Sequence, residues 1–439
     1  MNKTLKSLTS IALVGATTFV FAGCSSKAKN TGSASGKSST VNLSYWNIFV
    51  GADAHTKYMK QLLNDFKSAN PKIKITEQGI PNDQYKTKLQ TQAAAKQLPD
   101  MFINWPGALT QQFANNGLVT DITDTLNSNT DWKNGFFKGS YDDYTVNGKV
   151  YSVPIEESLT SVVYYNKTLF DKYNLQYPKT FDDLLKVVKV FNSHNIIPIS
   201  MGDKASWMAQ SCIMSSMGDH MTGTDWFKNA AANKGNKFTD PIFIKALDKL
   251  KQLSDAKAFN KDFMTLDDTQ QRNAFANGKA AMMIDGSWAI NDLATKASAD
   301  TLKNIEVGQI PGFTDGKGDQ STLAGATGIG VEINSQISKA KQTAALKFIQ
   351  FITSEKSFET AVKNNVLVPY NVTLDTSGLN PVFVKTMKLS KEHSLSPAYD
   401  SLLSAPAAEA TNNGLQSLLV GQSDSKTVAK QIQNAVESK

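Results

Sequence analysis

Three of the six tryptophans directly follow short apolar segments, and two of them have polar neighbours. An indole offers a broad apolar face and one N–H donor, while carboxylate and amide groups can bind two neighbouring hydroxyl groups. Together these groups suit the C–H faces and the hydroxyl rim of a pyranose ring. The candidate ligand contacts of this kind are Trp46 with Asn47, Trp105, and Asp285 with Trp288.

The segments around these residues have the pattern of an open α/β sheet. Residues 41–45 and 73–75 alternate between apolar and polar side chains, and apolar residues recur at helical spacing from Met59 to Phe66. Residues 101–103 form a further apolar run just before Trp105. Open α/β sheets bind ligands beyond the carboxyl ends of their strands. The pattern therefore predicts an α/β fold that places the tryptophans where such a ligand would lie.

The amino-terminal segment has the features of a secretion signal. Lys3 and Lys6 precede an apolar stretch over residues 11–22, which is too short to span a bilayer as a mature helix. The stretch ends in Phe21-Ala22-Gly23-Cys24, which resembles a bacterial lipobox except that Phe21 stands where Leu is usual. We expect residues 1–23 to be a signal peptide and Cys24 to be acylated. The alternative is a secreted protein cleaved nearby.

Residues 24–40 have the composition of a flexible tether, rich in Ser, Gly and Lys and without an acidic residue. Five lysines lie in the signal and the tether, and removing them from the formal charge of +7 leaves +2 for the folded part. This small charge gives no reason to expect nucleic acid as a partner. Cys24 and Cys212 are the two cysteines, so acylation of Cys24 leaves no pair for an intrachain disulfide.

Other site chemistries lack their sequence patterns. The four histidines are scattered and Cys212 stands alone, so no metal-ligand spacing is present. No phosphate-binding glycine loop of the GxxxxGK[ST] type and no GxSxG nucleophile turn occurs. We expect no metal, no cofactor and no catalytic residues, and ATP hydrolysis would belong to another subunit.

Over nearly all of residues 41–439 the chain resembles the family 1 extracellular solute-binding proteins, which are sugar-binding lipoproteins of ABC importers related to maltose-binding protein. Each motif is weak alone, but their order and spacing after a lipobox are specific. Phe181 stands where the family often has Trp. The matching segments are residues 98–102, 147–154, 164–167 with Leu169 and Phe170, 178–185, 275–282, and Gly286-Ser287-Trp288.

The resemblance implies a two-lobed, periplasmic-binding-protein-like α/β fold of type II. Each lobe would be a mainly parallel sheet flanked by helices, with the ligand cleft between the lobes. Chain crossings are expected just after Pro154, near residues 309–312 and near residues 351–353. The expected N-terminal lobe is 41–154 plus 312–352, and the expected C-terminal lobe is 155–311 plus 353–439.

The resemblance also points to further site residues. Trp288 occupies the Gly-x-Trp turn whose aromatic commonly stacks on sugar in the family, and Trp207 resembles an aromatic of the second lobe. Glu156 and Glu157 follow the crossing proline, where relatives often place an acid that binds hydroxyl groups, although solvated acids would look the same. Asp285 could instead cap the next helix. Each tryptophan, Trp46 and Trp105 included, could also close the core of a lobe.

These expectations describe a monomeric, lipid-anchored protein on the extracellular face of a Gram-positive membrane, which captures a carbohydrate, expected to be an oligosaccharide, and delivers it to an ABC permease. One alternative keeps the importer role with a polyamine or a glycerophosphodiester as ligand. The other is a surface glycosidase or lyase that uses Glu156 and Glu157. Adjacent residues on a strand point apart, whereas glycosidic acids face each other at about 5 to 9 Å, and this argues against the enzyme.

Overall fold

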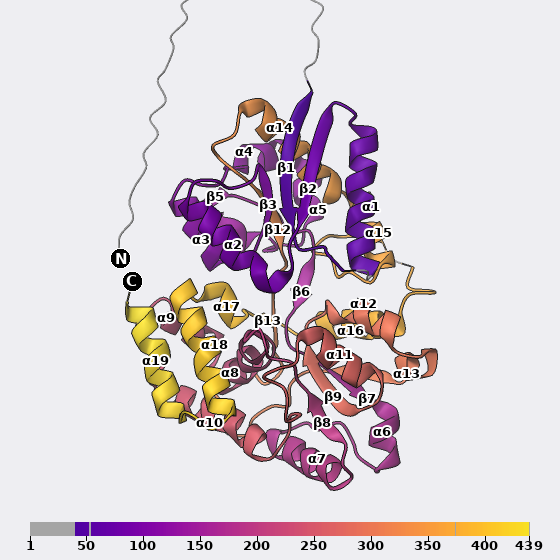
Figure 1. Cartoon of the computed structure of the whole chain (residues 1–439), viewed down its shortest axis with the longest axis vertical. Helices are drawn as coiled ribbons and strands as arrows, with labels where there is room; N and C mark the ends of the chain where they lie inside the picture. Colours follow the sequence, from indigo (N-terminus) through magenta and orange to yellow (C-terminus); the bar gives the residue numbers. More distant parts are fainter. Residues whose placement is uncertain (1–39, 52–53, 374, 439) are drawn as a thin grey trace, which may run out of the picture. The chain divides into compact units, whose positions relative to one another are not determined.

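The computed structural model describes residues 40–51, 54–373 and 375–438 (Figure 1). The expected signal peptide, Cys24 and residues 25–39 of the tether lie outside the described residues. Residues Thr40–Lys439 form one compact unit. None of the helices in this described part is long and apolar enough to cross a membrane.

The first lobe is built on a sheet with the strand order β12-β3-β1-β2. The central strand β1 is parallel to both of its neighbours, β2 and β3, and β12 joins β3 antiparallel. Apolar side chains alternate along β1 and fill β3, so the sheet buries both faces beneath helices. The strands are β1 (Val41–Asn47), β2 (Ile73–Gly79), β3 (Met101–Asn104) and β12 (Gly330–Ile333).

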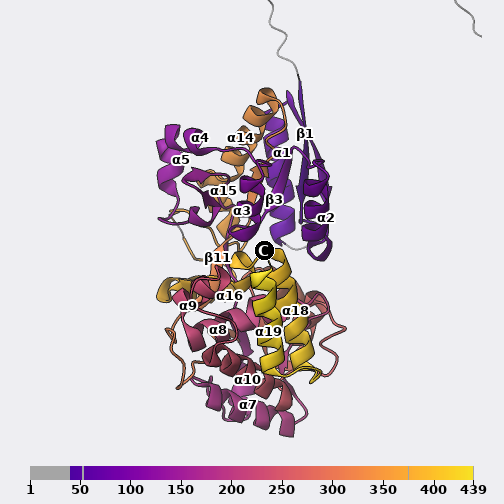
Figure 2. The same cartoon turned by 90° about the vertical axis from the view of Figure 1, so that its left-hand side faces the viewer.

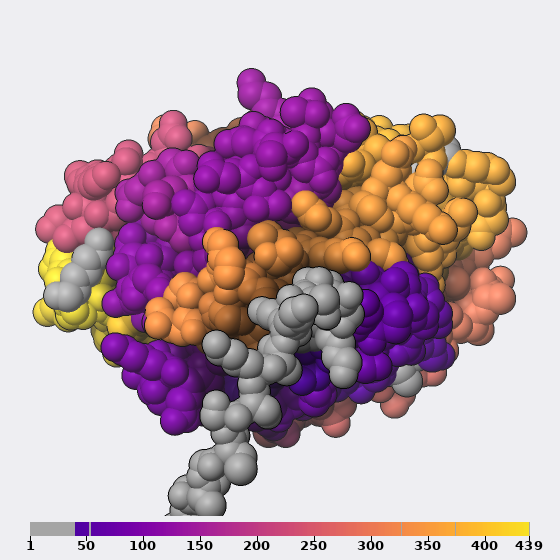
Figure 3. Space-filling model, turned by 90° about the horizontal axis from the view of Figure 1, so that it is seen from above, coloured from indigo at the N-terminus to yellow at the C-terminus, as the bar shows by residue number. Residues whose placement is uncertain are grey.

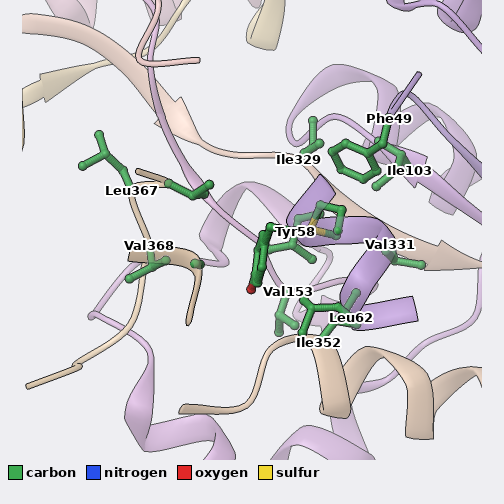
Figure 4. Packing of buried hydrophobic residues seen from close by; sticks show 14 of the residues in the cluster. Phe49, Tyr58, Leu62, Ile103, Val153, Ile329, Val331, Ile352, Leu367 and Val368 are labelled. Carbon is green, nitrogen blue, oxygen red and sulfur yellow. The ribbon is translucent and has the colours of Figure 1, made fainter. Parts of the chain in front are cut away.

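Helices α1 (Ala54–Ala69) and α14 (Lys339–Ile352) cover this sheet although they are far apart in the sequence. The ring of Phe348 in α14 lies 5.1 Å from that of Phe66 in α1 and 5.4 Å from that of Tyr45 in β1. Figure 3 shows the orange segment around residue 350 packed between the indigo and purple segments of the first 150 residues. Figure 4 shows part of the same apolar core, with Leu62, Val331 and Ile352 among its side chains.

The second lobe has a sheet with the strand order β10-β7-β9-β8. Here β9 is parallel to β8 but antiparallel to β7, and β10 is antiparallel to β7. The prediction of a mainly parallel sheet is therefore right for the first lobe and wrong in this detail for the second, because β7 enters the sheet directly from the chain crossing without a helical return. The strands are β7 (Val162–Asn166), β8 (Ile197–Ser200), β9 (Ala280–Asp285) and β10 (Ile305–Gly308).

Helices surround the second sheet, and α18 and α19 pack side by side in both views (Figures 1 and 2). Thr180 starts α7 by accepting a hydrogen bond from the backbone N–H of Asp183. The main helices of this lobe are α6 (Lys167–Lys172), α7 (Phe181–Ser193), α8 (Ser215–Thr222), α9 (Thr224–Ala231), α10 (Pro241–Asp255), α11 (Asp268–Ala276), α12 (Ala289–Lys296), α13 (Ala299–Lys303), α18 (Ala405–Leu419) and α19 (Ser425–Glu437).

Three short strands connect the lobes in a sheet of order β13-β11-β6. β6 (Glu157–Leu159) follows Pro154 by a few residues, β11 (Leu323–Thr327) pairs with it antiparallel, and β13 (Leu395–Ser396) pairs with β11 parallel. Two of the predicted lobe boundaries need correction against this sheet.

The predicted boundary at residue 312 is about ten residues early. Phe181 N–H donates to the Gly312 carbonyl oxygen, and the Phe181 and Phe313 rings lie 5.1 Å apart, so this segment remains with the second lobe until β11. No regular element marks the segment, and motif order alone could not show where it packs.

The boundary at residue 352 is also early. Helix α15 (Glu355–Lys363) packs on the first lobe, where the Tyr58 hydroxyl of α1 donates to the Ser357 carbonyl oxygen at 2.6 Å and the Phe358 ring lies 5.9 Å from that of Phe136. The amphipathic pattern of α15 predicts a helix but does not identify the lobe that covers its apolar face.

Candidate ligand-binding site

Trp46 and Trp105 lie at the carboxyl ends of neighbouring strands of the first lobe and are both half-buried. Helix α2 (Asn82–Ala94) supports them. The Tyr85 hydroxyl of α2 lies 3.1 Å from the Trp46 carbonyl oxygen, and its ring contacts that of Trp105 edge to face at 5.7 Å. Two lysines of α2 lie over the indoles: Lys88 Nζ is 4.6 Å from the Trp46 ring centre and Lys86 Nζ is 4.6 Å from that of Trp105.

Trp207 and Trp288 form an aromatic pair on the second lobe, with ring centroids 6.0 Å apart and an interplanar angle of 57°. Trp288 belongs to the turn between β9 and α12. A Cβ atom at Gly286 would lie 2.3 Å from the Trp288 ring, so the ring can fold over this position only because it is glycine. The Tyr164 hydroxyl donates to the Gly286 carbonyl oxygen at 2.9 Å and so fixes the backbone of this turn.

Trp207 stands just before a buried π-helix, residues Ala209–Met214. π-helices are rare, and those that occur are often found at functional sites. Asp203 Oδ1 accepts a hydrogen bond from the backbone N–H of Ala209 and so holds the loop that carries Trp207. Burial raises the pKa of Asp203 to about 6.

The two lobes contact each other at Trp207 and at Lys86, which lies over Trp105. Burial and nearby Asp268 raise the pKa of the Asp83 carboxyl group at the start of α2, and a hydrogen bond from the Trp207 indole partly opposes this rise. A salt bridge of 3.3 Å joins Lys86 to Asp400 in α17 (Tyr399–Leu402). Trp105 and Trp207 therefore lie beside contacts that join the two lobes, Trp288 packs against Trp207, and Trp46 ends the strand next to the one that precedes Trp105.

Asp285 does not have the surroundings expected of a ligand contact. Its carboxylate is fully buried and forms two contacts with Arg272, at 2.7 Å to Nε and 3.3 Å to Nη2. Asp285 Oδ1 also accepts the backbone N–H of Gly286 at 2.8 Å. We correct the prediction: this acid shapes the turn that carries Trp288, because its oxygen atoms are already bound within the protein.

Asn47 likewise serves the local backbone. Its side chain is 2% exposed, and its Oδ1 accepts the backbone N–H of Phe49 at 2.9 Å, which turns the chain after β1. The amide oxygen predicted to bind a ligand therefore has an internal partner.

Glu156 and Glu157 take partners in different directions. Glu156 Oε2 lies 3.3 Å from His55 Nε2 of α1, whereas Glu157 Oε1 accepts a hydrogen bond from the Ser390 hydroxyl of α16 (Pro381–Glu392) at 2.8 Å. Burial raises the pKa of both carboxyl groups, and His55 partly offsets this for Glu156. The two acids do not face one another as a glycosidic pair would.

The sequence pattern did not identify several residues near the tryptophans as parts of the site, among them Asp83, Lys86, Lys88 and Asp400. Each is an ordinary polar residue of a helix, and no motif or spacing distinguishes it. Lys86 and Asp400 meet across more than three hundred residues of sequence. Among the residues that the structure describes, no group of three or more His, Cys, Asp or Glu side chains is placed to hold a metal ion.

Comparison with known proteins gives a consistent result. The family model described as bacterial extracellular solute-binding protein matches residues 52–357. The multiple sugar-binding protein of Streptococcus mutans is 27% identical over 409 residues, which cover 90% of this chain and 86% of that protein. The melibiose/raffinose/stachyose-binding protein of Bacillus subtilis is 24% identical over 66% of this chain and 65% of its own length.

Solved structures agree in fold. A structure from work on xylan utilization by Caldanaerobius polysaccharolyticus superposes with a TM-score of 0.83 at 29% identity and covers 90% of this chain and 99% of its own. A chitin oligosaccharide binding protein superposes with a TM-score of 0.82 at 23% identity, over 90% of this chain and 98% of its own. The predicted two-lobed fold of type II is confirmed by these neighbours.

Proposed function

Because this chain belongs to the bacterial extracellular solute-binding protein family, we propose that it captures a carbohydrate outside the cell and delivers it to the permease of an ABC importer. The observation that supports this most directly is that Trp105 and Trp207 lie beside contacts that join the two lobes, with Trp46 and Trp288 as their neighbours. Stacking indoles and partly buried polar groups suit a sugar better than a small ion.

We propose an oligosaccharide as the ligand. Two indoles come from each lobe, so the site offers more apolar area than one pyranose ring can cover. The named relatives support this choice, since they include a multiple sugar-binding protein and a melibiose/raffinose/stachyose-binding protein. The solved structure at 29% identity comes from work on xylan.

Contacts from both lobes would couple binding to closure. A ligand favours the closed form only to the extent that it binds that form better than the open one. Trp105 from the first lobe and Trp207 or Trp288 from the second give such differential contacts. A micromolar dissociation constant corresponds to about −8 kcal/mol, which two stacked rings and several hydrogen bonds could supply after the cost of closure.

We further propose that Cys24 carries a lipid anchor and that the protein works as a monomer on the extracellular face of a Gram-positive membrane. The lipobox-like sequence before Cys24 and the polar composition of residues 25–40 support the anchor. The two lobes supply both sides of the site from one chain, so a second copy is not needed to complete it.

The alternatives fit the described side chains less well. A phosphodiester calls for arginine, and the single arginine of the chain, Arg272, is buried against Asp268, Asp285 and Asp292. A polyamine calls for free carboxylates. Asp400 and Glu156 already have basic partners, and burial raises the pKa of the Asp83 carboxyl group beside Trp207, which favours its neutral form. The diverging partners of Glu156 and Glu157 leave no pair for glycoside hydrolysis.

The test is a ligand panel with residues 40–439, read by intrinsic tryptophan fluorescence and thermal melting. The panel contains xylo-oligosaccharides, raffinose, stachyose, spermidine and glycerophosphocholine. We expect an oligosaccharide to shift both signals, and this shift to be lost in Trp288→Ala. A response to spermidine or glycerophosphocholine alone would overturn the carbohydrate assignment while leaving the importer role.

A further inference from the structure

Glu332 of β12 is a carboxylic acid inside the core of the first lobe, directly behind the site. It pairs in register with Phe102 of β3 and is fully buried. Its Oε2 accepts a hydrogen bond from Asn104 Nδ2 at 2.7 Å, and its Oε1 lies 2.6 Å from the Thr110 hydroxyl of α3 (Ala108–Asn115). Both partners are neutral, so no opposite charge offsets the desolvation of a carboxylate here.

The hydrogen-bond contacts of the Thr110 hydroxyl bear on whether Glu332 is protonated. The Thr110 hydroxyl oxygen also lies 3.0 Å from the carbonyl oxygen of Trp105. A hydroxyl group carries one hydrogen, and a carbonyl oxygen cannot donate. Both contacts can be full two-centre hydrogen bonds only if Glu332 supplies a proton to Thr110 and Thr110 gives its own hydrogen to the Trp105 carbonyl oxygen; with an ionised Glu332 the single hydroxyl hydrogen is shared between the two oxygen atoms.

We propose that Glu332 is a positioning residue of the ligand site that acts in its protonated form, as a donor to Thr110, which in turn donates to the backbone of Trp105. This relay fixes the chain at the point from which the Trp105 indole projects. The inference rests on the proposed function, because Trp105 is there a ligand contact. Glu332 itself touches no ligand.

The surroundings of Glu332 favour the neutral acid. The titratable groups that face it are Tyr85 of α2 and Tyr144 of η1 (Asp142–Tyr144), and the pKa of each phenol is raised well above its usual value by burial. Tyr144 lies 3.0 Å from the Asn104 carbonyl oxygen and so braces the same loop. Burial raises the pKa of Glu332 to about 7, with Thr110 and Asn104 partly opposing the shift.

Ionisation would break the relay. A carboxylate at position 332 can only accept, so it draws the hydrogen of Thr110 toward itself and weakens the hydrogen bond to the Trp105 carbonyl oxygen. The sign for stability follows from linkage: the contribution is complete below the unfolded pKa of about 4.3 and is lost as the pH rises through the folded pKa. Affinity would decline over the upper part of the same range.

The experiment compares the protein with Glu332→Gln, Thr110→Val and Thr110→Ser. Glutamine keeps a donor toward Thr110 without a titrating group, serine keeps the relay hydroxyl, and valine removes it. Glu306→Gln, on β10 of the second lobe, is the control for loss of a carboxylate elsewhere. The readouts are the infrared carbonyl band of a protonated acid, the indole N–H resonance of Trp105 assigned with Trp105→Phe, and the affinity for xylotriose.

We expect the infrared difference between the protein and Glu332→Gln to show the protonated-acid band at a pH of about 6, well above an ordinary glutamate pKa. Raising the pH to about 8.5 should shift the Trp105 resonance and weaken xylotriose binding by roughly two- to tenfold, the value of one hydrogen bond. Glu332→Gln should abolish both changes. Thr110→Val should bind weakly at either pH, and Thr110→Ser should behave as the parent.

Absence of the protonated-acid band at the lower pH would overturn the proposal, as would an unchanged pH profile in Glu332→Gln. If xylotriose fails to bind at all, the ligand assignment is at fault. The infrared band and the Trp105 resonance still decide the role of Glu332, because neither needs a ligand.

Discussion

Lys86 Nζ of α2 lies 3.3 Å from Asp400 Oδ2 of α17 and 4.6 Å from the centre of the Trp105 ring. One ammonium group therefore links the two lobes and covers a proposed ligand contact. The Lys86 side chain is 41% exposed and that of Asp400 is 26% exposed, so the pair alone contributes at most about 1 kcal/mol. Its effect should appear in the equilibrium between open and closed forms more than in folding.

Breaking this bridge should weaken ligand binding with little change in stability. We expect Lys86→Met and Asp400→Asn each to lower oligosaccharide affinity by about two- to fivefold, because the closed form loses up to about 1 kcal/mol. The double variant should lose little more than either single variant. Calorimetric titration in low and high salt measures the coupling, and fully additive losses would rule out the bridge as a closure contact.

Alanine substitutions at Gly107 and Gly117 distinguish a steric clash between the lobes from backbone strain alone. A Cβ atom here would lie 2.1 Å from the Ser401 carbonyl oxygen of α17, and the φ angle is +83°. Gly117 has a similar φ of +65°, but its Cβ would meet nothing within 4 Å. Gly107→Ala and Gly117→Ala should both cost stability, roughly 1 to 3 kcal/mol each, because alanine is strained at positive φ. The loss should be larger at Gly107, whose ψ of −127° lies outside the left-handed helical region and whose Cβ atom would also clash.

Only Gly107→Ala should also reduce affinity, because it pushes α17 away from the first lobe. Fluorescence titration of both variants with the oligosaccharide that binds the parent tests this. Equal affinities in the two variants would mean that this contact does not limit closure.

Trp288→Ala should lower affinity by at least about tenfold, roughly 1.4 kcal/mol, with a smaller change in melting temperature than a substitution of a fully buried residue, because the ring is only half-buried. The matched control is Trp226→Phe. Trp226 is buried in the second lobe, stacked on Phe243 at 5.4 Å, and its indole donates to Asp240 at 2.9 Å. Trp226→Phe should destabilise the fold and leave affinity intact. If instead Trp288→Ala destabilised the fold and left affinity intact, Trp288 would not be a ligand contact.

Arg272 should be required for folding of the second lobe. It is 6% exposed and neutralises Asp285, which has no other cation within reach among the described residues. Arg272→Met would leave that buried carboxylate unpaired, at a cost of about 3 to 5 kcal/mol. The double variant Arg272→Met/Asp285→Asn should recover part of the loss. Urea unfolding of the three proteins measures these values, and a neutral Arg272→Met would contradict the account.

His220 should make the protein less stable in acid. The ring is fully buried, its Nε2 lies 3.0 Å from the Thr322 carbonyl oxygen, and its Nδ1 has no partner in the described structure. Burial lowers the pKa of His220. Its contribution is present above the unfolded pKa of about 6.5 and is lost as the pH falls toward the folded value.

The variant His220→Gln removes this titration and keeps a donor toward Thr322. Relative to the parent, it should therefore gain stability as the pH drops below about 6.5. The exposed His194, changed to Gln, is the control. Thermal melting across this range gives the differences, and parallel curves for the parent and His220→Gln would refute the prediction.

The sequence alone identified the fold class and the family, because these follow from local patterns. Alternation in β1, helical spacing in α1 and ordered short motifs are properties of neighbouring residues. The same patterns placed Trp46, Trp105 and Trp288 at the ends of strands, where α/β proteins bind ligands.

Only the tertiary structure decided which polar residues belong to the site and where the lobes divide. Asp285 looks like a ligand contact until Arg272 is seen against it, and Asp83 and Lys86 gain a role only because α2 meets Trp207 and Asp400 of the other lobe. The physical reason is that burial and charge pairing depend on segments distant in sequence. Local pattern predicts an element, but long-range packing determines what each side chain touches.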